Sequence, residues 1–389
     1  MSEGARRYDI DWLRIIAMAG IFFLHALHLF DEGTDWHLRN VDQSTTVLIL
    51  RGVIDIWAIP LFFVLSGAGA WFALKRRSAG KFLTERVRRL LVPMYTVGIF
   101  AIVLPQIYFD AFTNGYRGGF WPIIAQNLKS VRFDPGWPGL TTFFPGHLWF
   151  LQMLFLVSVV VLPLLFYLRS ESGRRFIGRV AGWCSHRGGI FLLVIPIVIV
   201  RIALMGVFLG QHSWAYLAFY AVLFLIGYML VADERFTESI KRHGWIALVL
   251  GVAGFASIGL FVLALDYSMF DSPFSLQFVL YQVIVGVGTW GWIVFLMSMA
   301  KKHLNRPSRV LAYANEAVLP FYMFHQTVIL GVGWFVIRWN MGVLPKAIIV
   351  IVTSFSATLI LYDAFVRHSN VMRFFFGMRP KREPIPRKT

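Results

Sequence analysis

The sequence predicts an all-α, polytopic integral membrane protein with about ten transmembrane helices. Of its 389 residues, 58% are hydrophobic, and the mean hydropathy is +0.66, which is too apolar for an ordinary soluble protein. The apolar residues are grouped in blocks long enough for a helix to cross a bilayer core, which takes about 20 residues. The basic residues fall between these blocks. Segments rich in basic residues alternate along the chain with segments that hold few of them.

Each apolar block is a predicted membrane span. The spans form a single transmembrane domain over residues 10–366, with a cytoplasmic N-terminus at 1–9 and a basic cytoplasmic tail at 367–389. We expect the end of this tail, RPKREPIPRKT, to be disordered near anionic lipid headgroups. The expected spans are residues 10–30, 47–74, 90–109, 147–168, 189–210, 213–231, 244–265, 277–299, 310–337 and 344–366.

The distribution of lysine and arginine predicts the orientation in the membrane. Of the 37 basic residues, 28 lie in alternate segments that begin with the N-terminus, six lie in the intervening segments and three lie inside spans. Cytoplasmic loops carry the excess of Lys and Arg, so both termini are expected in the cytoplasm. The basic segments are residues 1–9, 75–89, 169–188, 232–243, 300–309 and 367–389.

The charge and cysteine content exclude several classes of function. The net charge of +17 does not predict nucleic-acid binding, because the basic residues occupy short loops and form no basic face with interleaved aromatic residues. The single cysteine, Cys184, excludes an internal disulfide and a cysteine-based metal cluster. We therefore expect no metal site.

The first span carries polar residues in an otherwise apolar helix. Asp11, Arg14, His25 and His28 fall on one stripe, because each helical residue advances about 100°. Arg14 and His25 are separated by about 16 Å of helix rise, which places Arg14 near the cytoplasmic side and His25 in the outer half. His28 is one turn nearer the outer interface, where we expect it to be solvated. In the structural interpretation, Arg14 snorkels to the interface and His25 is a hydrogen-bonded packing residue.

Other spans supply possible partners for these two residues. Glu316 is expected near the depth of Arg14, and His325 near the depth of His25, in the same span. Asp55 and Arg201 are also buried in apolar segments. A charged side chain at bilayer depth costs about 2.5–3.5 kcal/mol and usually faces a cavity or a partner. Structural ion pairing is the alternative for the buried acids and Arg201, but together these residues outline a polar cavity.

The most basic segment is KRRSAGKFLTERVRR, with seven positive charges in residues 75–89. A solvated loop that sets the topology is one interpretation. The other is that this loop holds a phosphorylated nucleotide, because the planar fork of arginine binds phosphate in a bidentate manner.

Five motifs, in order along the chain, resemble those of the acyltransferase family 3 integral membrane proteins. They are the pair Arg14-x10-His25, FFVLSG at 62–67, the RxxRLLVP run from Arg86 to Pro93, HLWFL at 147–151 and the late segment NEAVLPFYMFHQ. The resemblance covers essentially the whole chain. It is closest to the stand-alone branch of the family that includes periplasmic glucan succinyltransferases.

The resemblance implies an O-acyltransferase of the bacterial cytoplasmic (inner) membrane. Such an enzyme moves an acetyl or succinyl group from cytoplasmic acyl-CoA, a co-substrate rather than a bound cofactor, to a hydroxyl of an envelope or extracytoplasmic carbohydrate or glycolipid. The partners implied are thus acyl-CoA, that acceptor and membrane lipids. The residues that match the family's site are His25 as the catalytic histidine, Arg14 as its motif partner, Arg86 and Arg89 in the cytoplasmic loop, Ser66 and Gly67 after FFVL, Glu316 as an acid, and His325 where relatives carry paired histidines.

The residue types suit this chemistry. A neutral His25 could take the proton of a hydroxyl that attacks a thioester, and Asp55 or Glu316 could fix its tautomer. Oxyanion donors could be an arginine such as Arg201, the Trp149 indole N–H or freed backbone amides. A histidyl-acyl intermediate is also possible, and the sequence does not decide between direct transfer and a two-step reaction.

A secondary transporter or flippase is the alternative function, because polar residues on several spans could also line a substrate path. The chain shows no inverted repeat and no paired broken helices, which such transporters often have. Consumption of acyl-CoA with release of free thiol would distinguish the two.

The charge distribution yields a first testable prediction. A reporter enzyme that is active only outside the cytoplasm, fused after Thr389, should be inactive, because the 28 basic residues of the alternate segments hold both termini inside. The same reporter inserted between residues 130 and 131 of the long outer loop should be active. An active fusion at Thr389 would contradict the predicted orientation.

Overall fold

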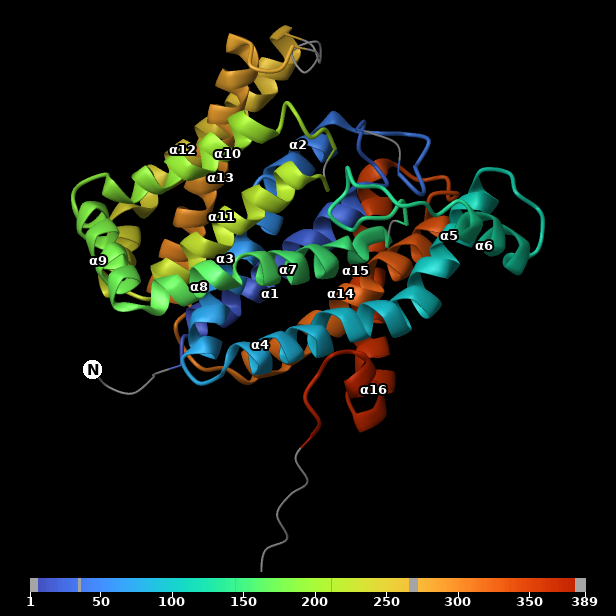
Figure 1. The fold of residues 1–389 in the computed structure, drawn as a ribbon. Coiled ribbons are helices and arrows are strands. Elements are labelled where there is room, and N and C mark those ends of the chain that lie inside the picture. Colours follow the sequence, from blue (N-terminus) through green and yellow to red (C-terminus); the bar gives the residue numbers. More distant parts are fainter. Residues whose placement is uncertain (1–5, 34–35, 144, 211, 266–271, 382–389) are drawn as a thin grey trace, which may run out of the picture.

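The computed structural model describes residues 6–33, 36–143, 145–210, 212–265 and 272–381. The secondary structure of these residues is mainly helix, and no β-strand occurs among them (Figure 1). Turns of 3₁₀ helix occur at Gly146–Leu148 and Gly189–Leu193, and turns of π helix at Val87–Leu91, Met94–Val103 and Tyr362–Val366. The α-helices are α1 Tyr8–Leu27, α2 Thr45–Asp55, α3 Ala58–Leu74, α4 Ala79–Arg86, α5 Leu104–Thr113, α6 Phe120–Lys129, α7 Trp149–Val160, α8 Leu162–Arg169, α9 Glu171–Ser185, α10 Val194–Leu204, α11 Trp214–Leu230, α12 Glu234–Leu265, α13 Leu276–His303, α14 Arg309–Val336, α15 Val343–Leu361 and α16 Asn370–Phe375.

Every predicted span coincides with a helical segment. In the described part of the chain, seven helical segments are long and apolar enough to cross a membrane, and the bent pair Gly146–Val160 and Leu162–Arg169 makes an eighth. The remaining two predicted spans correspond to the shorter apolar helices Gly189–Leu204 and Trp214–Leu230. The prediction of a polytopic all-α membrane protein is confirmed. The number of crossings and the orientation stay predictions.

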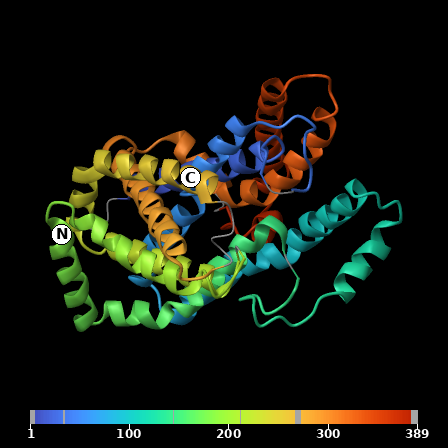
Figure 2. The ribbon, with the colours of Figure 1, turned by 90° about the horizontal axis from the view of Figure 1, so that it is seen from above.

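Helix α1 lies at the centre of the bundle. It packs against α2, α3, α13, α14 and α15, and Figure 2 shows it between the green and yellow helices on one side and the red helices α14 and α15 on the other. The longest pairing on the first side is between α12 and α13, and α3 packs along α11. This position surrounds the polar stripe of α1 with protein rather than lipid.

The basic segments meet at one end of the bundle, which we call the basic end. The backbone amide of Asp9 lies 3.4 Å from the side-chain oxygen of Asn305, and Arg235 donates to the Gly178 carbonyl at 2.9 Å. Figure 1 places α4 and α16 on this same lower side. The alternation of basic loops read from the sequence thus corresponds to a real spatial segregation.

The basic-poor segments meet at the other end, which we call the outer end. His37 lies 2.7 Å from Asp110, and Lys346 donates to Asn40 at 2.9 Å. The indole N–H of Trp214 donates to the Pro135 carbonyl at 2.8 Å. These contacts tie the loops at 31–46, 110–146 and 338–346 to one another.

The structure differs from the expected loop at 75–89. Instead of a loop followed by a span at 90–109, the chain forms one helical segment from Ala79 to Thr113. The Ser78 side chain accepts from the Lys81 amide at the start of α4, and the arginines that follow are good helix formers. Arg86 ends α4, and Arg89 lies in the π-helical turn that follows.

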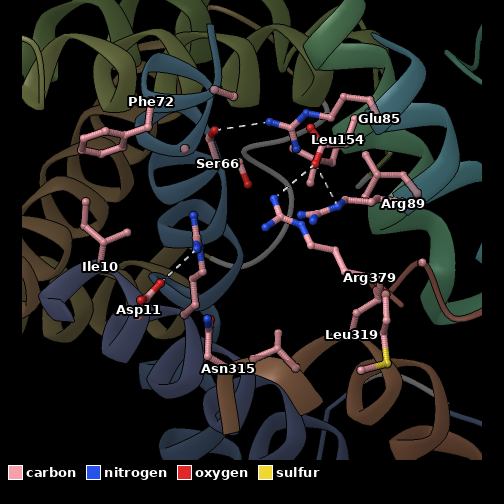
Figure 3. Close-up of a pocket in the computed structure, with 18 of the residues that line it drawn as sticks. Ile10, Asp11, Ser66, Phe72, Glu85, Arg89, Leu154, Asn315, Leu319 and Arg379 are labelled. Carbon is pink, nitrogen blue, oxygen red and sulfur yellow. Dashed lines mark hydrogen bonds and ion pairs between the residues drawn. The ribbon is translucent and has the colours of Figure 1, made fainter. Parts of the chain in front are cut away.

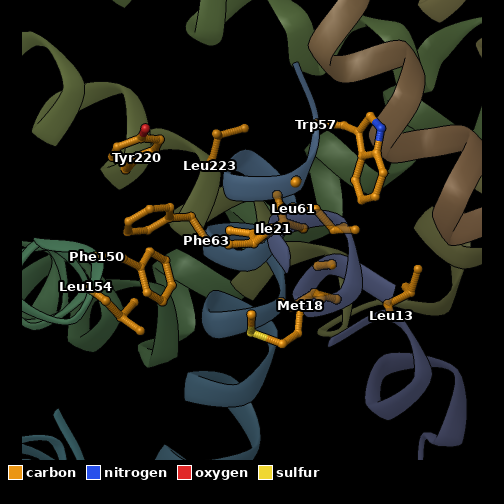
Figure 4. Close-up of a cluster of buried hydrophobic side chains, with 14 of the residues drawn as sticks. Leu13, Met18, Ile21, Trp57, Leu61, Phe63, Phe150, Leu154, Tyr220 and Leu223 are labelled. Atoms are coloured by element: carbon orange, nitrogen blue, oxygen red, sulfur yellow. The ribbon is translucent and has the colours of Figure 1, made fainter. Parts of the chain in front are cut away.

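One layer of the core consists of large apolar side chains from four helices (Figure 4). Leu13 and Ile21 of α1, Phe63 of α3 and Phe150 of α7 are all buried, and Phe63 stacks on Tyr220 of α11 with ring centroids 4.1 Å apart. This layer lies between the basic end and the outer end.

Gly67 contributes to helix packing rather than to a cavity. A Cβ built on Gly67 would lie 1.8 Å from the Phe224 carbonyl oxygen, and one on Gly227 would lie 1.9 Å from the Val64 carbonyl oxygen. Small residues let helix backbones approach in membranes, where the hydrophobic effect does not drive association. The SG motif therefore places α3 directly against α11.

The C-terminal segment is more ordered than the expected tail. Arg373 of α16 is buried and donates to Glu316 and to the Arg379 carbonyl, and Gly377 adopts a φ of +66° where a Cβ would clash with the Arg89 carbonyl. Residues 367–381 are thus part of the folded domain. The rest of the expected disordered tail, 382–389, lies outside the described residues.

The Gly67 contact yields a stability prediction. Gly67→Ala should lower the thermal stability of the detergent-solubilised protein and the yield of monodisperse protein, because overpacking at a rigid backbone costs about 1–3 kcal/mol or more. The matched control is Gly331→Ala in α14, where a Cβ meets nothing within 4 Å. Equal stability of the two variants would contradict this account of Gly67.

Candidate active site

A large basic cavity opens at the basic end of the bundle (Figure 3). Its volume is about 1160 Å³. Among the described residues, three acidic side chains line it: Asp11, Glu85 and Glu316. The basic residues that line it are Arg6, Arg7, Arg14, Lys75, Arg76, Arg77, Arg86, Arg89, Arg373 and Arg379. This excess of positive charge, in a cavity partly walled by apolar helices, favours a ligand with several negative charges.

Arg14 reaches this cavity from α1. Its guanidinium lies 3.3 Å from Asp11, one turn earlier on the same helix. A Cβ on Gly69 would lie 3.0 Å from Nη2 of Arg14, so the glycine leaves room for the guanidinium. The expectation that Arg14 faces an interior space at the basic end agrees with this position.

The arginines of the basic segment enter the cavity from the opposite side. Arg86 Nη2 lies 3.5 Å from the Ser66 carbonyl oxygen, and Arg89 lies 3.3 Å from Glu85. Ser66, Arg86 and Arg89 all line the cavity, whereas Gly67 is absent from its lining and packs on α11. The two residues of the SG motif thus have different positions, one facing the cavity and one facing a helix.

Glu316 faces the same cavity, at the depth of Arg14, but it is already paired. Its carboxylate forms an ion pair with Arg373 of α16. The cavity therefore brings together Arg14, Ser66, Arg86, Arg89 and Glu316 among the residues predicted from the sequence.

His25 lies in the outer half of α1 and meets His325 of α14. Nδ1 of His25 is 2.8 Å from Nε2 of His325, and Nδ1 of His325 is 2.6 Å from the Tyr322 carbonyl oxygen. A carbonyl only accepts, so Nδ1 of His325 carries the hydrogen and its Nε2 accepts from His25 Nδ1–H. These two hydrogen bonds leave the lone pair of His25 on Nε2, where it can accept a proton.

The structure gives His25 a different partner from the expected acid. His325 holds its Nδ1, whereas Glu316 is bound to Arg373 at the other end. Asp55 ends α2, is exposed and interacts with the charges of Arg51 and His28. Neither carboxylate occupies the tautomer-fixing position. A histidine can fill it because its neutral ring both donates and accepts.

His28 is buried, which contradicts its expected solvation. Its Nδ1 lies 3.0 Å from the Asp31 carboxylate, and Arg51 pairs with the same carboxylate at 2.7 Å. Burial raises the pKa of Asp31, but the contacts with His28 and Arg51 outweigh it, so the pKa is lowered. Trp36 stacks on both His28 and His25, with ring centroids 5.1 and 6.1 Å away. His28 thus supports the aromatic cover of His25.

His147 belongs to this group, and the sequence analysis quoted its motif without selecting it. Its ring centroid lies 5.1 Å from that of His325 and 6.4 Å from that of His25. Nε2 of His147 is 3.1 Å from the Met323 carbonyl oxygen, and the Tyr322 hydroxyl donates to the backbone carbonyl of His147. The sequence signal was a histidine at the first position of an apolar span. No group of residues in the described part of the chain is arranged to hold a metal ion.

Two predicted residues lie away from both groups. Arg201 is buried on α10, donates to Gln282 at 2.8 Å and stands over the Phe219 ring. Trp149 packs its ring against His212, with centroids 4.3 Å apart. Arg201 is in the helix layer of α10, α11 and α13, so this structure does not bring it to His25.

Aromatic rings connect the lining of the basic cavity to the histidines. Phe62 and Phe150 line the cavity and contact each other, and Phe150 also contacts Tyr322, with ring centroids 5.4 and 5.9 Å apart. Phe150 follows His147 by three residues, about 5 Å of helix rise. An elongated ligand in the cavity that displaces these rings would reach the histidine pair.

The chain was compared with known proteins. The model of the acyltransferase 3 family, described as an acyltransferase domain, matches residues 7–363. Glucans biosynthesis protein C of Salmonella paratyphi B is 22% identical over 96% of this chain and 95% of its own length. The protein of the same name from Escherichia coli O139:H28 is 23% identical over 97% and 96%. No solved structure matches the chain. The chain therefore belongs to the acyltransferase 3 family and is an integral membrane acyltransferase.

Proposed function

We propose that this acyltransferase takes an acetyl or succinyl group from acyl-CoA in the cytoplasm and transfers it to a hydroxyl of an envelope carbohydrate or glycolipid. The observation that carries the proposal is the series of aromatic contacts, from Phe150 to Tyr322 to His325, that connects the polybasic cavity to the His25–His325 pair. The name of the relatives, glucans biosynthesis protein C, supports a glucan as the acceptor class. The enzyme would reside in the bacterial cytoplasmic (inner) membrane.

The donor would bind in the basic cavity with its phosphates toward the arginines. Arg86 and Arg89 face the cavity from the helix that begins at Ala79, and Arg14 faces it from α1. The acyl-pantetheine arm is long and flexible, and it would pass Phe62 and Phe150 toward the histidines. The thioester would thus enter from the basic end and the hydroxyl from the outer end.

His25 would act as the general base. As the acceptor hydroxyl oxygen bonds to the thioester carbonyl carbon, its proton passes to Nε2 of His25. The carbon–sulfur bond then breaks, and the CoA thiolate leaves and recovers the proton, so the products are an ester and free CoA thiol. His325 would stabilise the imidazolium through the Nδ1–H hydrogen bond at 2.8 Å, as the orienting partner does in other histidine bases.

The hydrogen-bond chain yields a prediction on catalysis. His25→Ala should lower the rate of acyl transfer by about 10²–10⁴, the usual contribution of a general base, while acyl-CoA binding stays near normal because His25 is outside the basic cavity. The measurement is thiol release from acyl-CoA in the presence of a glucan acceptor, with binding measured separately.

The control for this experiment is His28→Ala. This variant should retain most of the turnover but lose thermal stability, because His28 holds Asp31 and supports Trp36 without contacting His325. Near-normal turnover of His25→Ala would show that the base lies elsewhere.

The donor site yields a second prediction. Arg86→Ala combined with Arg89→Ala should weaken acyl-CoA binding by at least about tenfold, because hydrogen bonds to charged groups contribute about 1.5–3 kcal/mol each. Added salt should weaken the wild-type complex as well. Calorimetry or fluorescence titration in detergent would measure both effects.

A matched control removes the same charge elsewhere. Arg174→Ala combined with Arg175→Ala changes two exposed residues of α9, outside the cavity, and should leave binding unchanged. If the Arg86 and Arg89 double variant binds as the control does, this segment only sets the topology.

A further inference from the structure

Glu85 lies among three arginine side chains. It forms an ion pair with Arg77, lies 3.3 Å from Arg89 and lies 3.8 Å from Arg379. Figure 3 shows Arg89 and Arg379 both directed at this carboxylate. We propose that Glu85 fills a phosphate position of the donor nucleotide in the free protein and is displaced when the donor binds. This inference rests on the proposed function, because it takes acyl-CoA as the ligand.

Two of the three cations come from outside the helical segment that carries Glu85. Arg77 follows α3, and Arg379 follows α16, almost 300 residues along the chain. Arg89 is the neighbour at the i,i+4 spacing that stabilises a helix, but Arg77 and Arg379 are not at that spacing. Convergence from remote segments is instead the pattern of a binding site, in which the fold assembles cations around one anionic position.

Glu85 is bound differently from the other two acids of the cavity. Glu316 forms an ion pair with the single residue Arg373, which is almost completely buried. Asp11 contacts Arg6 and Arg14 beside it on or before α1. Three cations face Glu85, so one carboxylate neutralises only a part of their charge. A phosphate carries up to two negative charges and three acceptor oxygens, and it satisfies such a cluster better.

The cluster is also accessible to a ligand. A second cavity of about 810 Å³ adjoins the first, and Arg77, Glu85, Arg89 and Arg379 line both. The side chains of Glu85 and Arg379 remain 26% and 71% exposed. Ion pairs this exposed are weak and exchange readily, so a phosphate can displace the carboxylate without unfolding the segment.

The arrangement assigns a role to the C-terminal segment. Gly377, Met378 and Arg379 line both cavities, and the buried ion pair between Arg373 and Glu316 anchors this segment to α14. Arg379 is thereby held over Glu85. The nucleotide would lie between the Arg77–Arg89 segment and the C-terminal segment, with its acyl arm toward α1.

The test is a titration of the full-length protein in detergent with CoA and, separately, with adenosine 3′,5′-bisphosphate. Glu85→Gln removes the competing charge and keeps the shape, so it should bind both ligands at least about threefold more tightly than wild type, with a steeper salt dependence. Arg379→Gln should bind both more weakly. Glu171→Gln makes the same change of net charge at a side chain that is 80% exposed on α9, and it should bind as wild type does.

The outcomes separate this inference from the proposed function. If wild-type protein binds no CoA, the donor site of the proposed function is wrong. If wild type binds CoA but Glu85→Gln binds it equally or more weakly, Glu85 is a structural ion-pair partner and the inference is wrong. Should Glu85→Gln fail to fold, Glu85→Asp provides the second test: the shorter side chain withdraws from Arg379, and tighter binding is again expected.

Discussion

The requirement that polar groups at membrane depth have protein partners determines the architecture of this enzyme. Helix α1 carries Arg14 and His25 about three turns apart on an apolar segment. Neither can face acyl chains at low cost. The bundle therefore surrounds α1 with five helices, which gives Arg14 a polybasic cavity and gives His25 a second histidine.

The same requirement divides the molecule into two functional ends. At the basic end, charge is concentrated beyond what its own acids neutralise, and the surplus is stable only beside water or an anionic ligand. At the outer end, the polar groups are neutral or paired: His25 with His325, and His28 with Asp31. An aromatic layer that includes Phe62 and Phe150 separates the ends. It would keep water and ions from crossing while leaving a short path for an acyl chain.

Two of the residues that match the family's site motifs make packing or anchoring contacts between helices. Gly67 allows α3 and α11 to touch, and Glu316 anchors α16 through Arg373. Both contacts hold neighbouring helices together. A loss of activity on their substitution is therefore expected to come with a loss of stability, unlike a loss at His25.

The sequence by itself determined the class of protein and the segregation of basic loops, and it singled out Arg14 and His25 as polar residues of the first apolar helix. Apolar block length and Lys/Arg bias are local properties that the bilayer acts on directly, so they can be read without coordinates. Only the tertiary structure decided which polar groups meet. His325 rather than an acid holds His25, His147 joins them, and Arg379 comes from the C-terminal segment to Glu85. These pairings join residues that are more than 100 positions apart, and their geometry depends on how helices rotate and cross, which the helical period of one segment does not contain.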